Sequence, residues 1–147
     1  MKTFKILILA VFLLMSFSAY AENSFIKEDQ GDVEQVITNF VKNVDSRNAG
    51  DLTKSILPSA SIVVVNDLTK SIDSYSGSQF VNLVKAGQKG GWQRNVNISS
   101  VDLDGNTAIA KVNITDTRLK ETGYFTLIKD NGAWKVAGEI TTLKLNK

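Results

Sequence analysis

The sequence predicts an α+β fold with three helices and about six strands, most of them antiparallel. Two observations lead to this prediction. Near the start of the chain, apolar residues recur every three to four positions, which is the period of a helix. After Pro58, apolar and polar residues mostly alternate, which is the period of a strand, and tight-turn sequences separate the long alternating runs.

Three stretches have the pattern of helices. The first begins at Asp32 and ends at Asn48-Ala49-Gly50, and a short second helix occupies residues 51–57 and stops at Pro58. The third begins at Ser76. Asp32 and Ser76 are each followed three residues later by Gln, which resembles a capping box. The apolar face of the first helix is formed by Val33, Val36, Ile37, Phe40, Val41 and Val44.

Six runs have the pattern of strands, and Asp104-Gly105-Asn106 and Asp130-Asn131-Gly132 are strong tight-turn signals between the later ones. The β-branched run Ile62-Val63-Val64-Val65 suits a strand that is covered on both faces. The predicted strands are residues 61–66, 70–75, 92–103, 107–117, 119–129 and 133–145.

Alternation also assigns side chains to the two faces of the sheet. In the run from Trp92, the apolar positions change parity, so we expect a bulge near Ser99-Ser100. In the last run, Trp134, Val136 and Ile140 share one face, and Lys135 and Glu139 share the other. The alternation therefore predicts that Glu139 points away from the core.

The composition excludes several classes of chemistry, because the 147 residues include neither Cys nor His. Without Cys there is no disulfide, no thiolate nucleophile and no Cys-ligated zinc or iron–sulfur cluster. Without His there is no imidazole base and no Ser-His-Asp triad, and the commonest metal ligand is missing. We expect no cofactor and no metal, and we assign no catalytic residue.

The first 21 residues have the pattern of a secretory signal peptide. Lys2 and Lys5 precede an apolar run over residues 6–15, and small residues stand three and one positions before Glu22. This run is about half of the roughly 20 residues that cross a membrane. We expect cleavage after Ala21, a protein that is periplasmic or secreted, and no membrane association after cleavage.

The remaining chain is predicted to be one domain, residues 32–147, after a polar and flexible lead-in of residues 22–31. Subtracting the 21 leader residues from 147 leaves 126, and the loss of Lys2 and Lys5 reduces 17 basic residues to 15, equal to the 15 acidic ones. The net charge of the mature chain is then zero. This balance gives no reason to expect a nucleic-acid partner.

The order of elements is similar to that of the nuclear transport factor 2-like superfamily. Residues 48–52 (Asn48-Ala49-Gly50-Asp51-Leu52) match a Gly-Asp step between the family's first two helices. Residues 124–136, with residues 101–108, look most like the bacterial "putative lumazine-binding" branch, close to the SnoaL-like proteins. The resemblance implies a cone, in which a strongly bent sheet wraps the long helix. Its motifs are turn and core residues, so they indicate fold rather than function.

The resemblance also bears on activity. Similarity to the ketosteroid isomerases implies a Tyr on the long helix and an Asp on the first strand. The corresponding positions here hold Phe40 and Val63-Val64-Val65, which provide neither a hydroxyl nor a carboxylate. The polyketide cyclases of the superfamily generally rely on His, which this chain lacks. The best-known activities of the superfamily are therefore not expected.

Five residues are the candidate ligand contacts. Arg94 alternates with apolar neighbours, so it must reach the rim of the sheet, pair with an inward acid such as Asp116, or hold an anionic ligand bidentately. Asp116 continues the inward face of its own strand. Aromatic side chains are candidates to line a cavity, although such spacing is also typical of plain core. The five candidates are Arg94, Asp116, Trp92, Phe40 and Tyr124.

Three functions remain open. The first is non-catalytic binding of a small, largely apolar or anionic ligand inside the cone. The second is protein–protein interaction, such as a homodimer, through the outer face of the sheet, which requires an exposed apolar patch there. The third is a SnoaL-like enzyme that uses a carboxylate such as Asp116 or Asp73, which requires a buried acid facing a cavity. We favour binding or interaction over catalysis.

Overall fold

The computed structural model describes residue 27 and residues 29–146. The predicted signal peptide, its cleavage site and most of the predicted lead-in lie outside these residues. The chain divides into two units, Met1–Gly31 and Asp32–Lys147, and the second unit contains the fold. Within the described part of the chain, no helix is long and apolar enough to span a membrane.

The N-terminal helix includes residues 29–45, and its apolar face is buried as the period predicts. Val33, Ile37 and Val41 are at most 1% exposed. Residues 27 and 29–31 are already helical, so Asp32, the predicted start, lies inside the helix and is not its N-cap. Its predicted capping box with Gln35 is therefore wrong.

The second helix, α2 (Ala49–Ser55), begins and ends earlier than predicted. Its N-cap is Asn48, whose side-chain oxygen accepts a hydrogen bond from the backbone N–H of Asp51 at 3.2 Å. Asp51 was predicted as the cap, but Asn48 supplies the acceptor one turn earlier. Residues 56–58 then belong to a strand, because the chain is already extended at Ile56.

The third helix, α3 (Gly77–Lys85), has the predicted capping box. The backbone N–H of Gln79 donates to the Ser76 hydroxyl at 3.2 Å, and the Gln79 side chain accepts from the backbone N–H of Ser76 at 2.8 Å. Two orphan donors at the helix start are thereby satisfied.

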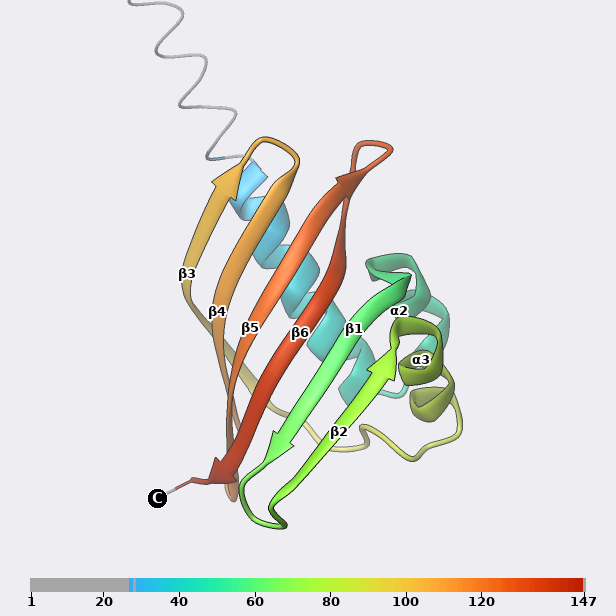
Figure 1. Cartoon of the computed structure of the whole chain (residues 1–147), viewed down its shortest axis with the longest axis vertical. Helices are drawn as coiled ribbons and strands as arrows, with labels where there is room; N and C mark the ends of the chain where they lie inside the picture. Colours follow the sequence, from blue (N-terminus) through green and yellow to red (C-terminus); the bar gives the residue numbers. More distant parts are fainter. Residues whose placement is uncertain (1–26, 28, 147) are drawn as a thin grey trace, which may run out of the picture. The chain divides into compact units, whose positions relative to one another are not determined.

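Six strands form one sheet in the order β2-β1-β6-β5-β4-β3 (Figure 1). Only β1 and β6 are parallel, and the other neighbours are antiparallel. The predicted class, α+β with a mostly antiparallel sheet, is confirmed. The strands are β1 (Ile56–Asn66), β2 (Ser71–Ser76), β3 (Asn95–Asp104), β4 (Thr107–Thr115), β5 (Leu119–Asp130) and β6 (Ala133–Leu145).

Two irregularities change which side chains face inward. The pairing of β3 with β4 shifts between Ile98 and Ser100, as the change of parity predicts. In β6, Gly138 pairs with Thr126 of β5 and Val136 pairs with Leu127, so Ala137 has no partner on β5. An extra residue of this kind is a β-bulge, and it reverses the alternation beyond it.

Because of the bulge in β6, the faces predicted for Glu139 and Ile140 are wrong. Before the bulge, Trp134 and Val136 are buried, as expected. Beyond it, Glu139 is only 7% exposed, whereas Ile140 is 57% exposed. The two side chains therefore lie on the faces opposite to those that simple alternation assigns.

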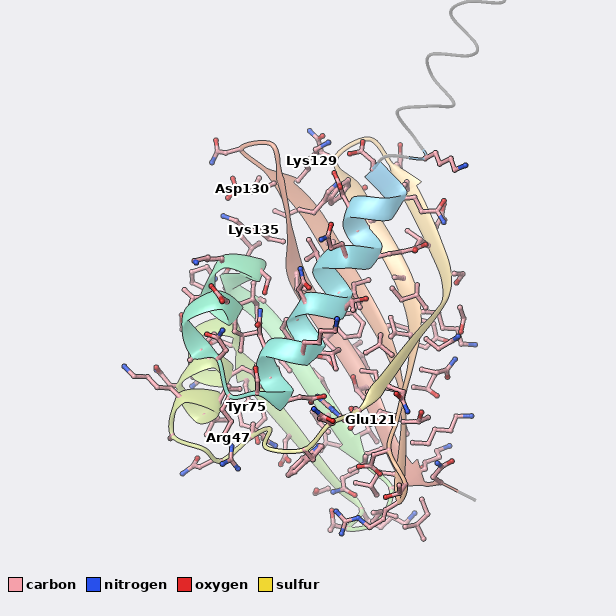
Figure 2. All side chains as sticks on the ribbon, turned by 180° about the vertical axis from the view of Figure 1, so that it is seen from behind. Arg47, Tyr75, Glu121, Lys129, Asp130 and Lys135 are labelled. Atoms are coloured by element: carbon pink, nitrogen blue, oxygen red, sulfur yellow. The ribbon has the colours of Figure 1, made fainter. Side chains whose placement is uncertain are left out.

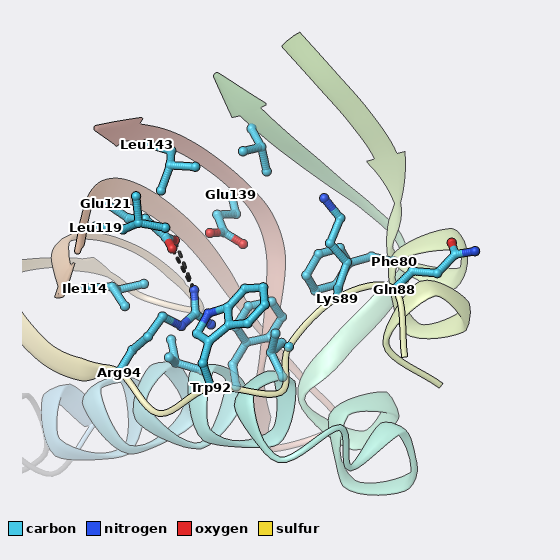
Figure 3. Close-up of a pocket in the computed structure, with 15 residues that line it drawn as sticks. Phe80, Gln88, Lys89, Trp92, Arg94, Ile114, Leu119, Glu121, Glu139 and Leu143 are labelled. Carbon is cyan, nitrogen blue, oxygen red and sulfur yellow. Dashed lines mark hydrogen bonds and ion pairs between the residues drawn. The ribbon is translucent and has the colours of Figure 1, made fainter. Parts of the chain in front are cut away.

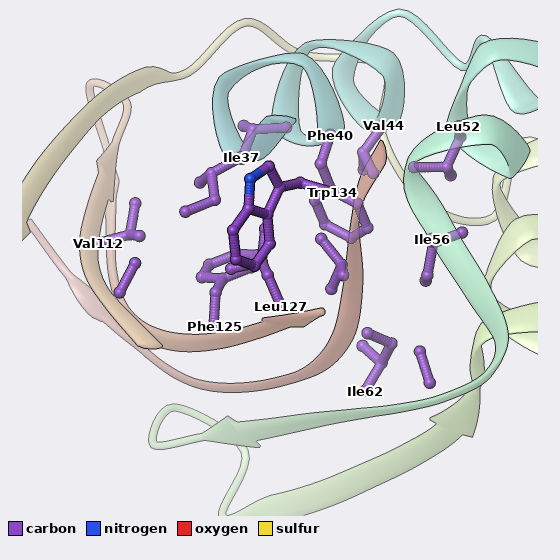
Figure 4. Packing of buried hydrophobic residues seen from close by; sticks show 14 of the residues in the cluster. Ile37, Phe40, Val44, Leu52, Ile56, Ile62, Val112, Phe125, Leu127 and Trp134 are labelled. Atoms are coloured by element: carbon purple, nitrogen blue, oxygen red, sulfur yellow. The ribbon is translucent and has the colours of Figure 1, made fainter. Parts of the chain in front are cut away.

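The long helix lies against the concave face of the sheet, and the core fills the space between them (Figures 1 and 4). The ring of Phe40 is stacked on Phe80 at 5.9 Å between centroids and meets Phe125 edge-on at 5.7 Å. These rings link the helix to α3 and to β5. Phe40 and Phe80 also form part of the wall of a cavity.

Candidate functional site

A cavity of about 270 Å³ lies between the helix, the loop that precedes β3 and the concave face of the sheet (Figure 3). Its wall is mostly apolar, and its charged groups come from the loop and from β5 and β6. The lining residues are Phe40, Val41, Val44, Val64, Phe80, Gln88, Lys89, Gly90, Trp92, Arg94, Ile114, Leu119, Glu121, Glu139 and Leu143.

Close packing of the loop on the end of the helix positions Trp92 and Arg94. Gly90 has φ +77°, and a Cβ there would lie 1.8 Å from the carbonyl oxygen of Val44, so only glycine fits. The backbone N–H of the next residue, Gly91, donates to the carbonyl of Asp45 at 2.8 Å. Trp92 and Arg94 therefore lie in this loop and not in β3, where they were predicted.

Arg94 joins the helix to the sheet through two carboxylates. Its Nε donates to Asp45 Oδ1 at 2.7 Å, and its Nη1 donates to Glu121 Oε1 and Oε2 at 2.9 and 3.1 Å. The backbone N–H of Arg94 also donates to Asp45 Oδ2 at 3.0 Å. In Figure 2, Glu121 lies near the C-terminal end of the helix, where Asp45 lies.

These ion pairs are buried. The side chains of Arg94, Asp45 and Glu121 are 11%, 8% and 16% exposed. Burial opposes the charge on Arg94, but the carboxylates of Glu121 and Asp45 outweigh it and raise the pKa of the guanidinium. Of the three outcomes expected for Arg94, the structure shows pairing with inward acids. The partners are Asp45 and Glu121, however, and not Asp116.

Glu139 is a further ionisable group inside the fold, and the alternation of apolar and polar residues predicted that it lies on the opposite face. Its carboxylate projects from β6 into the cavity (Figure 3). The hydroxyl of Thr141 donates to Oε1, and within the described residues it is the only hydrogen-bond partner of this carboxylate. Burial raises the pKa of Glu139 to about 7, and the nearby charge of Glu121 adds to the shift.

A sequence signal for Glu139 does exist. Gly138 precedes it, and a glycine inside a strand often marks a bulge, beyond which the alternation reverses. Glu139 also meets the requirement set for an enzyme, a buried acid facing a cavity. The acids named for that role, Asp116 and Asp73, do not line this cavity.

The cavity includes three of the five predicted contacts. Phe40 and Trp92 line it along with Arg94, and Trp92 is still 47% exposed at its edge. Tyr124 does not line it. Tyr124 pairs with the exposed Ile140 on the outer face of the sheet and is 50% exposed. Its assignment to the cavity was wrong, because the inward residues of β5 are its neighbours Gly123 and Phe125.

Asp116 organises a turn and does not belong to the cavity. It lies just after β4, and its Oδ1 accepts from the backbone N–H groups of Arg118 and Leu119 at 2.6 and 2.7 Å. These two hydrogen bonds hold the pKa of the Asp116 carboxyl below its usual value. The turn residues 116–118 explain why β4 ends at Thr115, two residues earlier than predicted.

The arrangement combines an apolar wall with an excess of negative charge. Three carboxylates, those of Asp45, Glu121 and Glu139, surround the single guanidinium of Arg94. Lys89 lies at the edge with its Nζ 5.2 Å from the centre of the Tyr75 ring, an ordinary cation–π distance. Among the described residues, no group of three or more acidic side chains is arranged to hold a metal ion.

A family model matches most of the chain. Residues 28–140 match the model of the family described as "Putative lumazine-binding". The chain belongs to this family. The match covers the helix, the cavity loop and β6 as far as Ile140, so the putative lumazine-binding domain includes Arg94, Glu121 and Glu139. No curated protein matches the chain.

Solved structures show the same fold. An NTF-2 like protein of unknown function from Silicibacter pomeroyi has a TM-score of 0.69 at 15% identity, covering 82% of this chain and 98% of that one. An NTF2-like protein of unknown function from Shewanella baltica has a TM-score of 0.65 at 18% identity, covering 84% and 97%. An NTF2-like protein with a cystatin-like fold from Novosphingobium aromaticivorans has a TM-score of 0.63 at 14% identity, covering 84% of this chain and 86% of that one. At these identities the likeness establishes the nuclear transport factor 2-like fold alone.

Proposed function

We propose that this domain binds a small, largely apolar molecule in the cavity between the helix and the sheet, without changing it chemically. The cavity is the observation that carries this proposal. Its volume of about 270 Å³ is close to the lower end of ligand pockets, roughly 300–1,000 Å³. Its wall contains aromatic and aliphatic side chains and a few convergent polar groups, which is the usual composition of such sites.

Binding is favoured over catalysis by the groups in the wall. The lining includes no Ser, Thr, Tyr, Cys or His, so the usual hydroxyl, thiol and imidazole nucleophiles and proton donors are missing from it. The donors of Arg94 point to Asp45 and Glu121, so they are not directed at a ligand. What the wall offers is a shape, three aromatic rings and two acids, of which Glu121 is paired with Arg94 and Glu139 forms no ion pair with a described residue.

The fluorescence of Trp92 provides a test. In a Trp134→Phe background, the neutral probe 1-adamantylmethanol should change the emission of Trp92 with a saturable dependence on concentration. Leu143→Phe, which fills the cavity from β6, should abolish this change. Leu145→Phe is the matched control, because the same change on the same strand falls on a side chain that is 58% exposed. A signal that survives Leu143→Phe would place the probe elsewhere and contradict the proposal.

We also propose that the protein is exported and functions in the periplasm or outside the cell. The charged start, the apolar run and the small residues before Glu22 support this proposal. Protein recovered from the producing cell should begin at Glu22. Recovery of an N-terminal peptide that still contains Met15 would contradict cleavage at this site.

A second candidate function is homodimerisation through the outer face of the sheet, and one observation favours it. Apolar side chains are exposed on neighbouring strands there: Ile109 on β4 is 55% exposed, Tyr124 on β5 50% and Ile140 on β6 57%. Exposed apolar surface of this kind often marks an interface. Sedimentation should show a dimer that Tyr124→Lys dissociates, and a monomer at high concentration would exclude this role.

A further inference from the structure

The charges in the cavity restrict the chemical class of its ligand. Arg94 already donates to both oxygens of Glu121 and is paired with Asp45, with Nη2 only 2.6 Å from Asp45 Oδ1. A carboxylate or phosphate could reach the guanidinium only by displacing one of these acids. It would then lie in the same cavity as Glu121 and Glu139, where like charges repel in a poorly solvated space. An anionic ligand is therefore disfavoured.

Glu139, in contrast, has hydrogen-bonding capacity left. A carboxylate accepts several hydrogen bonds, and the hydroxyl of Thr141 uses one position on Oε1. No described residue donates to Oε2, although the residue is only 7% exposed. Among the described residues no fully buried side-chain oxygen lacks a partner, so Oε2 is accessible from the cavity, where a ligand can donate to it.

The surroundings of Glu139 also favour a positive partner over a neutral one. Asp45 and Glu121 together carry two negative charges against one on Arg94, so an ionised Glu139 adds a third, and this carboxylate forms no ion pair with a described basic side chain. The ammonium of Lys89 forms no ion pair with a described carboxylate and lies over the Tyr75 ring. The rings of Phe40, Phe80 and Trp92 line the cavity, and the partial negative charge on aromatic faces attracts cations.

We propose that the cavity binds a small organic cation, an amine with an apolar body, whose protonated nitrogen donates to the Glu139 carboxylate while its body lies against Phe40, Phe80 and Trp92. This inference rests on the proposed binding function and specifies its ligand class. Binding then requires the ionised form of Glu139. The charged groups that face this carboxylate are Glu121 on β5, Arg94 and Lys89 in the loop, and Asp45 behind Arg94 on the helix.

Three probes with one body and three head groups test this inference. Isothermal titration calorimetry at pH 8 should give 1-adamantylmethylamine a Kd at least ten times lower than that of 1-adamantylmethanol. The third probe, 1-adamantanecarboxylate, should bind more weakly than the alcohol. Between pH 6 and pH 8 the affinity for the amine should rise about tenfold, because an acid with a pKa near 7 goes from about one-tenth to about nine-tenths ionised. The affinity for the alcohol should show no such rise.

Variants of two acids complete the experiment. Glu139→Gln should reduce the affinity for the amine to that for the alcohol and remove its pH dependence, while the alcohol still binds. Asp102→Asn is the matched control, since it removes the same charge from an exposed position on β3 and should change neither affinity.

The outcomes separate the two proposals. Equal affinities for the amine and the alcohol would overturn the inference and leave the binding function intact. Tightest binding of the carboxylate would also overturn it and would point to Arg94 as the receptor. An absence of binding by all three probes would overturn both proposals.

Discussion

Replacing Arg94 with methionine should lower the free energy of unfolding near pH 7 by about 3–5 kcal/mol, the usual cost of removing one partner from a buried ion pair. The methionine keeps most of the apolar stem but leaves Asp45 and Glu121 without their cation. Both carboxylates are mostly buried, at 8% and 16% exposure, so water replaces the guanidinium poorly. Urea denaturation of the wild type and the variant measures the difference.

Two comparisons isolate the buried charges as the cause. In Arg94→Met combined with Asp45→Asn and Glu121→Gln, most of the stability should return, because no uncompensated charge remains inside. Lys135→Met is the comparison at an exposed ion pair. Lys135 Nζ lies 2.8 Å from Asp130 Oδ2, and the two side chains are 29% and 37% exposed, so its loss should change the free energy of unfolding by less than about 1 kcal/mol. If Arg94→Met changed stability as little as Lys135→Met does, the buried network would be contradicted.

Glu139→Gln should have the opposite effect and raise the free energy of unfolding at pH 8 by roughly 3 kcal/mol. The pKa of Glu139 is about 7 in the folded protein, against an ordinary value of 4.5. Above pH 7 the Glu139 carboxylate is ionised in an apolar surrounding, and this burial destabilises the folded protein. In the unfolded chain the same carboxylate is hydrated and carries no such penalty. Glutamine has nearly the same shape and no charge.

The sign of the pH dependence follows from the direction of the shift. Below about pH 4.5, Glu139 is protonated in both states and contributes no penalty. As the pH rises from 4.5 to 7, the unfolded chain releases the proton more readily, so the wild type loses stability relative to the variant. Above pH 7 the difference is constant.

Chemical denaturation of both proteins at pH 5, 6, 7 and 8 measures this curve, and Asp102→Asn serves as the exposed control. A difference between wild type and Glu139→Gln that did not change with pH would show that the pKa of Glu139 is not raised. The prediction would then be wrong, and so would the pH dependence expected for amine binding.

Local pattern was enough to predict most of the fold. The face of the long helix from Val33 to Val44, the capping box at Ser76, the bulge near Ser99 and the bounds of β6 follow from side-chain period and turn chemistry, which depend on neighbours in sequence. Two of the errors fall where two local signals compete. Asn48 and Asp51 are both good caps, and the segment at Ile56 suits a helix or a strand until the parallel partner β6 selects the strand.

The positions and partners of the polar groups in the site could be found only from the tertiary structure. The sequence indicated that Arg94 needs a partner, but Asp45 and Glu121 are 49 and 27 residues away, and only the packing of the loop on the helix end brings them together. Glu139 faces the cavity because Ala137 has no partner on β5, and the pairing of two strands decides which residue is left out. The sequence by itself determined the helix, the strands and the apolar wall, since side-chain period selects which face is buried. The position and charge of the acids inside were decided by register and loop packing, which are contacts between distant residues.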